Sequence, residues 1–189
     1  MQVRPVLQVN GFFRSATTYT QSTVKLAFSQ LDVKHSHSPS FIEKRIENNY
    51  LIVACIRNPI DSISSCIILM GQENKPDHVI EGTIKKNISS LSAIKEAKGS
   101  IVISSFEDIV KDYQPLLREI SKKYGYEYTV PSYEKVIDLL PKMQGNEYIR
   151  SGRLPRDSSN LKAIALNRLD SPIFKSYLDE SLDIYNQII

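Results

Sequence analysis

"PVLQVNGFFRSATTYTQSTVKLAF", residues 5–28, joins a strand pattern, a polar loop and a helix pattern without a break. Residues 5–10 predict a strand, and residues 17–31 predict a helix with apolar positions available to a core, namely Val24, Leu26, Ala27 and Leu31. The first amides of a helix lack partners within the helix, and its dipole makes this end positive. The stretch therefore predicts an α/β fold with an anion-binding loop over residues 11–18.

The rest of the chain repeats the alternation of short apolar runs with longer amphipathic ones. Strands are predicted over 32–38, 50–57 and 100–105. Helices are predicted from Pro39 or Ser40 to about Glu47, from Asn58, over 77–98, over 107–124, and from Ser171 toward the C-terminus. Residues 125–158 predict irregular structure with a short helix at 132–140. We therefore expect a three-layer α/β/α fold around a central, mainly parallel β-sheet, in one domain spanning residues 1–189.

The composition is that of an ordinary globular protein, with 41% hydrophobic and 24% charged residues. A net charge of +3 suits an anionic ligand but does not predict a nucleic-acid surface. The apolar runs are too short to span a bilayer, and the N-terminus has no signal-peptide pattern. Cys55 and Cys66 lie in apolar stretches and are expected to be buried free thiols, not a disulfide or a metal site. A cytoplasmic protein with no nucleic-acid or membrane partner is expected.

The loop "GFFRSATT", residues 11–18, differs from the triphosphate-binding pattern G-x-x-x-x-G-K-[ST]. Ala16 and Thr17 replace the second glycine and the lysine. Enzymes that transfer the terminal phosphoryl group of a triphosphate use a lysine and magnesium. A sulfuryl group carries less negative charge and needs no metal. The loop therefore favours a sulfuryl donor over a triphosphate.

This loop resembles the 5′-phosphosulfate loop of the P-loop sulfotransferases, which reads G-x-P-[KR]-S-G-T-T followed by an aromatic residue. The matching residues are Gly11, Arg14, Ser15, Thr17, Thr18 and Tyr19. Phe13 replaces the proline, and Ala16 replaces a glycine that would allow a positive φ or a close approach of the phosphate. The resemblance implies that the matching residues and Ala16 bind the 5′ end of 3′-phosphoadenosine 5′-phosphosulfate, and that Arg14 stabilises the leaving oxygen.

"IRNPIDSISS", residues 56–65, places Arg57 at the end of a buried strand and begins a capped helix at once. Arg57 and Ser65 are expected to converge on one anion at the C-terminal edge of the sheet, where open α/β sheets bind ligands. The stretch resembles the 3′-phosphate motif of the same family, R-N-P-x-D-x-x-x-S, at every fixed position. This implies that Arg57 and Ser65 bind the 3′-phosphate.

"RSGR", residues 150–153, resembles the R-K-G segment that closes over the 3′-phosphate in the family. Arg150 and Gly152 match, and Ser151 replaces the lysine. Arginine suits this role because its planar group makes two parallel bonds to a phosphate. The resemblance implies that Arg150, Ser151 and Gly152 complete the 3′-phosphate site, while an exposed basic loop is the alternative.

"VKHSHSP", residues 33–39, resembles the K-T-H-x-P segment that carries the general base of the family. His37 takes the position of the base and His35 that of the lysine, and either is a candidate catalytic residue. Alternate strand residues share a face, so both rings are expected on one side. A neutral imidazole accepts a proton from an attacking hydroxyl or amine. A solvent-exposed polar edge strand is the alternative.

"SSFEDI", residues 104–109, resembles the Y-E-D-[LM] segment of the family, with Phe106 in place of a tyrosine that lies near the adenine. Tyr19 and Phe106 are therefore the candidates for stacking on adenine, although both could equally be core aromatics.

Together the motifs predict a sulfotransferase that uses 3′-phosphoadenosine 5′-phosphosulfate, releases 3′-phosphoadenosine 5′-phosphate and requires no metal. The acceptor is expected to be a hydroxyl or amine on a small molecule or glycan. A P-loop small-molecule kinase and a catalytically inactive nucleotide-binding relative are the alternatives. The sequence leaves the acceptor and the oligomeric state open, a homodimer included.

Overall fold

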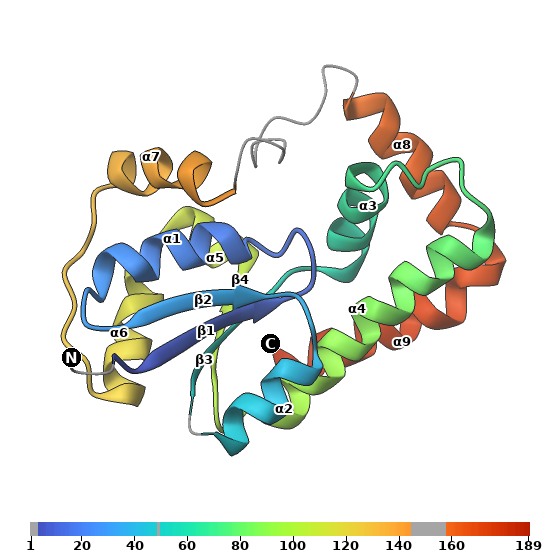
Figure 1. The fold of residues 1–189 in the computed structure, drawn as a ribbon. Coiled ribbons are helices and arrows are strands. Elements are labelled where there is room, and N and C mark those ends of the chain that lie inside the picture. Colours follow the sequence, from blue (N-terminus) through green and yellow to red (C-terminus); the bar gives the residue numbers. More distant parts are fainter. Residues whose placement is uncertain (1–3, 49, 145–157) are drawn as a thin grey trace.

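The computed structural model describes residues 4–48, 50–144 and 158–189 and contains a four-stranded sheet (Figure 1). The strands are β1 (Val6–Gly11), β2 (Asp32–Ser36), β3 (Leu51–Ile56) and β4 (Val102–Ser105). Their order is β2-β1-β3-β4, and every neighbouring pair is parallel. Parallel neighbours require crossover connections, which the intervening helices supply. The expected α/β class with a parallel sheet is confirmed.

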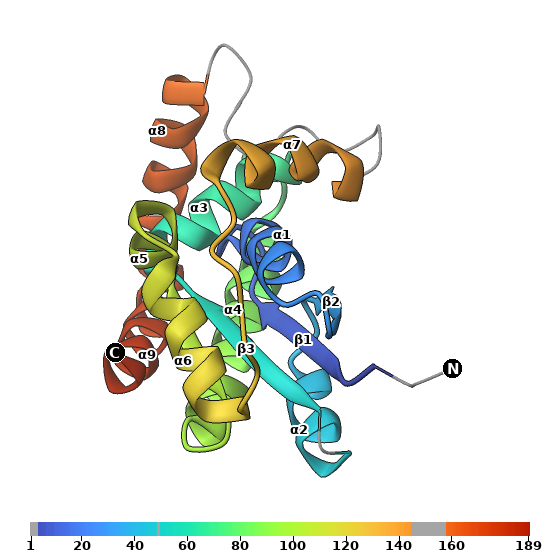
Figure 2. The same ribbon diagram turned by 90° about the vertical axis from the view of Figure 1, so that its left-hand side faces the viewer.

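Helices cover both faces of the sheet, as Figures 1 and 2 show from two sides. One face packs against α1 (Thr17–Ala27), α5 (Phe106–Lys111) and α6 (Gln114–Tyr124). The other face packs against α2 (Ser40–Glu47), α4 (Asp77–Ala97) and α9 (Pro172–Ile188). A seventh helix along the chain, α7 (Tyr133–Gln144), packs on α1. These helices and the sheet form the three layers.

Strand β3 shows why the sheet is buried on both sides. Ile52, Ala54 and Ile56 face the α2, α4 and α9 layer. Val53 and Cys55 face the α1 and α6 layer, and all five side chains are at most 2% exposed. A run of apolar residues without alternation is typical of a parallel strand covered on both faces.

A further apolar cluster lies beyond the carboxyl end of the sheet, where α3 (Pro59–Leu69) and α8 (Ser158–Leu169) pack together. It contains Phe12 from the loop after β1 and Phe174 from α9. The cluster therefore fixes both helices close to the loops that follow the strands (Figure 1).

The region predicted as one helix over 107–124 contains two helices, α5 and α6, so that expectation was wrong. Pro115 lies in the first turn of α6, where its missing N–H costs nothing. Asp112 ends α5, and its Oδ1 accepts from the backbone N–H of Gln114 at 2.9 Å. The proline and this short polar turn divide the pattern.

Two further helices differ from the expectations. Helix α7 extends to Gln144, beyond the short helix expected at 132–140. Helix α8 begins at Ser158, where we expected no helix. Its apolar residues Leu161, Ala165 and Leu169 recur every fourth position and face the cluster at α3, so a helical pattern was present in the sequence.

Both cysteines are free and buried, as expected. Burial raises the pKa of Cys55 to about 12 and that of Cys66 to about 11. In the described ranges, no helix is both long and apolar enough to cross a membrane.

The strand register brings the ends of all four strands to one edge. Gly11 lies opposite Cys55 at the ends of β1 and β3, and Ile56 lies opposite Ser105 at the ends of β3 and β4. Ser36, at the end of β2, lies opposite Asn10. The residues that follow β1, β2, β3 and β4 therefore meet at the carboxyl edge of the sheet, which is the usual ligand-binding edge of open α/β sheets.

Candidate anion-binding site

Gly11 ends β1 where the chain passes closest to β3. Its φ is 157°, and a Cβ at this position would lie 2.4 Å from the carbonyl oxygen of Cys55. No side chain fits at that separation without movement of the β3 backbone. The glycine is therefore required for the strand to turn into the loop.

The loop from Gly11 to α1 contains two residues in the left-handed region, Arg14 with φ 68° and Ala16 with φ 62°. Left-handed backbone costs a residue with a Cβ roughly 1–2 kcal/mol. The loop pattern that this segment resembles has a glycine at the position of Ala16. Ala16 adopts the left-handed conformation that a glycine would favour there. The loop keeps its shape at the cost of strain.

Ala16 is the N-cap of α1 and supplies no side-chain oxygen to the first turn. Its carbonyl accepts from Thr20, which leaves the helix amides before Thr20 without acceptors inside the helix. Backbone amides in a turn with left-handed residues form a concave anion site, and the helix dipole adds to it.

The hydroxyl residues that the resemblance assigns to the 5′-phosphosulfate are buried or half-buried. Ser15 and Thr17 are only 2% and 4% exposed, while Thr18 and Tyr19 are half-buried. Tyr19 packs against the core on the α1 side of the sheet, and burial raises its pKa to about 12. The loop thus offers its backbone amides more than a row of exposed hydroxyls.

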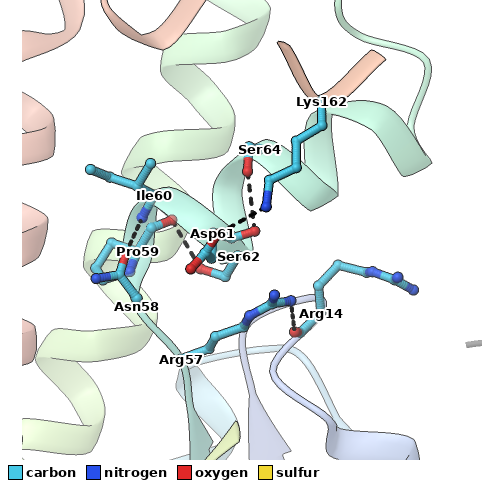
Figure 3. A network of polar contacts seen from close by, with 9 residues as sticks. All are labelled: Arg14, Arg57, Asn58, Pro59, Ile60, Asp61, Ser62, Ser64 and Lys162. Atoms are coloured by element: carbon cyan, nitrogen blue, oxygen red, sulfur yellow. Dashed lines mark hydrogen bonds and ion pairs between the residues drawn. The ribbon is translucent and has the colours of Figure 1, made fainter. Parts of the chain in front are cut away.

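Arg57 joins the two motifs that the sequence analysis singled out. It follows β3 directly, and its Nη1 donates to the carbonyl oxygen of Arg14 at 3.2 Å (Figure 3). The Nε atoms of Arg14 and Arg57 are both buried and have no hydrogen-bond partner in the described part of the chain. Burial and the neighbouring Arg57 charge lower the pKa of Arg14. Two neighbouring arginines, each with an unused Nε donor, favour an anion.

Phe106 lies against Arg57, not in an isolated aromatic pocket. The guanidinium carbon of Arg57 is 4.0 Å from the centre of the Phe106 ring, which is a cation–π contact. Ser105 caps α5 by accepting from the N–H of Asp108 at 3.0 Å, and so fixes the start of the helix that carries Phe106. The ring therefore supports Arg57, and its stacking on adenine stays a prediction.

Helix α3 begins immediately after Arg57 because its first turn is well capped. The side-chain oxygen of Asn58 accepts from the N–H of Ile60 at 3.0 Å, and Pro59 occupies the first turn. Ser65 is half-buried and lies two turns into the helix. Arg57 thus lies just before α3 and Ser65 lies along it, and their convergence on one anion stays a prediction.

His37 follows β2 and lies against the first loop. Its Nδ1 is 2.9 Å from the carbonyl oxygen of Gly11. A carbonyl only accepts, so Nδ1 carries the hydrogen and Nε2 keeps its lone pair. The ring also packs on Phe13, with centres 4.3 Å apart. The pKa of His37 is lowered, mainly by burial. The lowered pKa favours the neutral, proton-accepting form of the ring.

His35 lies beside His37, with ring centres 5.7 Å apart. The expectation that both rings share one side is confirmed. His35 is more exposed than His37, and burial also lowers its pKa. Because His37 has the contact with Gly11, it is the histidine held in a fixed position against the loop.

Asn10 is a site residue that sequence reasoning missed. It is 1% exposed, and its Oδ1 accepts from the N–H of Gly11 at 2.6 Å. Its Nδ2 donates to the carbonyl oxygen of Ser38 at 3.1 Å. The side chain therefore ties the first loop to the segment that carries His37. The available signal was a polar residue at the end of an apolar strand.

Lys162 is a second residue that the sequence did not reveal. It projects from α8 and pairs with Asp61 of α3, with Nζ and Oδ1 3.5 Å apart. Figure 3 shows the pair beside Arg57 and Arg14. Arg150, Ser151 and Gly152 lie outside the described residues, so their expected role stays a prediction. No group of three or more metal-ligating side chains occurs within 4–48, 50–144 and 158–189.

No protein-family model matches the sequence, and no curated protein is significantly similar to it. Functional inference therefore rests on the geometry of this edge of the sheet.

Proposed function

We propose that the chain is a P-loop sulfotransferase that uses 3′-phosphoadenosine 5′-phosphosulfate. The observation that carries the proposal is the hydrogen bond from Arg57 to the carbonyl oxygen of Arg14, because it joins the two anion-binding motifs. A nucleotide with phosphate groups on the 3′ and 5′ oxygens of its ribose presents two anionic groups to the protein. The paired motifs offer one such position at the start of α1 and one at the start of α3.

In this proposal the loop amides after Arg14 hold the 5′-phosphosulfate, and Arg57 with Ser65 holds the 3′-phosphate. The buried, unpartnered Nε donors of both arginines support this, since a buried donor without a partner costs about 1–3 kcal/mol. An anion would satisfy them.

The proposed transfer uses His37 as the base. The acceptor oxygen or nitrogen attacks sulfur, Nε2 of His37 takes the acceptor proton, and the bond between sulfur and the bridging phosphate oxygen breaks. The electron pair stays on that oxygen, whose charge Arg14 stabilises. The contact between Nδ1 and Gly11 supports this role because it leaves Nε2 free to accept.

Ligand-induced thermal stabilisation tests the proposal. The purified chain is heated with 3′-phosphoadenosine 5′-phosphate or with ATP and magnesium. A ligand at 100 times its Kd adds about 2.7 kcal/mol to the free energy of unfolding, which raises Tm by about 5–11 °C for a chain of this size. We expect this shift with the bisphosphate alone. A shift only with ATP and magnesium would indicate a phosphotransferase.

Transfer itself is measured with labelled donor and a panel of hydroxyl and amine acceptors. Binding of the bisphosphate without transfer to any acceptor would indicate the nucleotide-binding alternative. The strained Ala16 is the observation that favours keeping that alternative in the test.

A further inference from the structure

Helix α8 is held against α3 by packing, not by its charged residues. Ala165 and Leu169 are buried in the cluster that includes Ile63 and Ile67 of α3, and Leu161 packs against its edge. Full burial of a leucine side chain such as Leu169 stabilises by about 1.5–3 kcal/mol. The position of Lys162, the residue after Leu161, is therefore fixed by the apolar contacts beside it.

The side chain of Lys162 reaches the face of α3 that carries the phosphate motif. It pairs with Asp61, and Ser65 lies one helical turn after Asp61, so the two share a face. Figure 3 shows the amino group of Lys162 directed toward Asp61, on the side of α3 where Arg57 and Arg14 lie. Lys162 thus approaches, from a different helix, the face of α3 on which Ser65 also lies.

The ion pair with Asp61 is weak enough to exchange. The side chains of Lys162 and Asp61 are 49% and 43% exposed, and their charged atoms are 3.5 Å apart. Exposed pairs of this kind contribute about 0–1 kcal/mol. Among the residues drawn in Figure 3, the positive charges of Arg14, Arg57 and Lys162 lie near one carboxylate, that of Asp61. The excess of positive charge favours a further anion.

We propose that Lys162 binds the 3′-phosphate of the donor, moving its ammonium from Asp61 to the phosphate. This inference rests on the proposed function and adds a residue that selects for the 3′-phosphate. A lysine suits the role because its flexible stem lets a compact charge move between two partners. The R-K-G segment that residues 150–152 resemble has a lysine where this chain has Ser151. Lys162 would supply a lysine charge to the same phosphate from a different position.

The test compares two nucleotides that differ in the 3′-phosphate. Affinities of the wild type and of Lys162→Gln are measured by calorimetry for 3′-phosphoadenosine 5′-phosphate and for adenosine 5′-phosphate. We expect the variant to lose about 5- to 20-fold in affinity for the bisphosphate and less than twofold for the monophosphate. Lys95→Gln is the matched control, because Lys95 is exposed in the last turn of α4, which leads to the opposite edge of the sheet.

A second comparison separates direct binding from neutralisation of Asp61. Lys162→Gln is measured again in an Asp61→Asn background. A loss of bisphosphate affinity that persists there supports a direct contact, whereas a loss that disappears shows that Lys162 only offsets Asp61 and overturns the inference.

The outcomes also distinguish the two proposals. If the wild type binds both nucleotides equally, the proposed function and this inference both fail. If the wild type prefers the bisphosphate and Lys162→Gln keeps the same preference, this inference alone fails.

Discussion

Replacement of Arg57 by alanine is the most informative perturbation of the site. The change removes the bond to the carbonyl oxygen of Arg14, the contact with the Phe106 ring and a buried donor. A hydrogen bond that involves a charged group contributes about 1.5–3 kcal/mol. We therefore expect the affinity for 3′-phosphoadenosine 5′-phosphate to fall by about 2–3 kcal/mol, which is about 30- to 150-fold.

Arg57→Lys separates charge from geometry in the same assay. Lysine keeps the positive charge but loses the planar arrangement of donors, so we expect a loss of about tenfold. The assay is calorimetric titration at fixed ionic strength, because screening weakens exposed charge interactions. Circular dichroism and thermal unfolding establish that each variant is folded, since loss of the ring contact alone removes about 0.5–2 kcal/mol.

Arg168→Ala is the matched control. Arg168 also lies near the site helices, in the last turn of α8, but it bonds to Asp77 and to the carbonyl oxygen of Lys75. We expect unchanged nucleotide affinity for this variant. A folded Arg57→Ala protein that binds the bisphosphate within threefold of the wild type would refute the reasoning, because the two motifs would then not share a ligand.

Three further predictions concern the first loop and the residues that contact it, Asn10 and His37. Ala16→Gly relieves a left-handed alanine, which is worth about 1–2 kcal/mol, but adds about 0.5–1 kcal/mol of unfolded-state entropy. Urea unfolding should therefore show a net gain of about 0–1.5 kcal/mol, and a loss would contradict the strain. Asn10→Ala leaves the N–H of Gly11 and the carbonyl of Ser38 without this partner, and should lower the free energy of unfolding by about 1–3 kcal/mol in the same measurement; unchanged stability would contradict it. Transfer should decline as pH falls through the pKa of His37, which lies below the ordinary value of about 6.5, because only the neutral ring accepts a proton. His37→Gln should abolish transfer and leave donor affinity unchanged. Loss of activity in His35→Gln alone would instead identify His35 as the base.

The same pKa shift has a consequence for stability. Burial favours the neutral form of His37 in the folded state, so the folded chain binds fewer protons than the unfolded chain on acidification. This contribution is present above the unfolded pKa and is lost as pH falls through the folded pKa. His37→Gln should therefore flatten the acid side of a plot of stability against pH.

The sequence by itself determined the α/β class and most of the elements, but not the break between α5 and α6 or the helix α8. The apolar run of β3 and the cap at Asn58 are local signals, because each can be identified from a few consecutive residues. The spacing of His35 and His37 likewise placed both rings on one side, since alternate strand residues share a face.

Tertiary structure decided which side chains meet. Arg57 bonds to Arg14 and lies on Phe106 although these residues are 43 and 49 positions away, and Lys162 reaches Asp61 from a helix that we did not expect. Such pairs depend on strand order and helix packing, to which no local pattern corresponds. Local patterns fix where a strand or helix begins and ends, whereas contacts between distant residues exist only once the chain is folded.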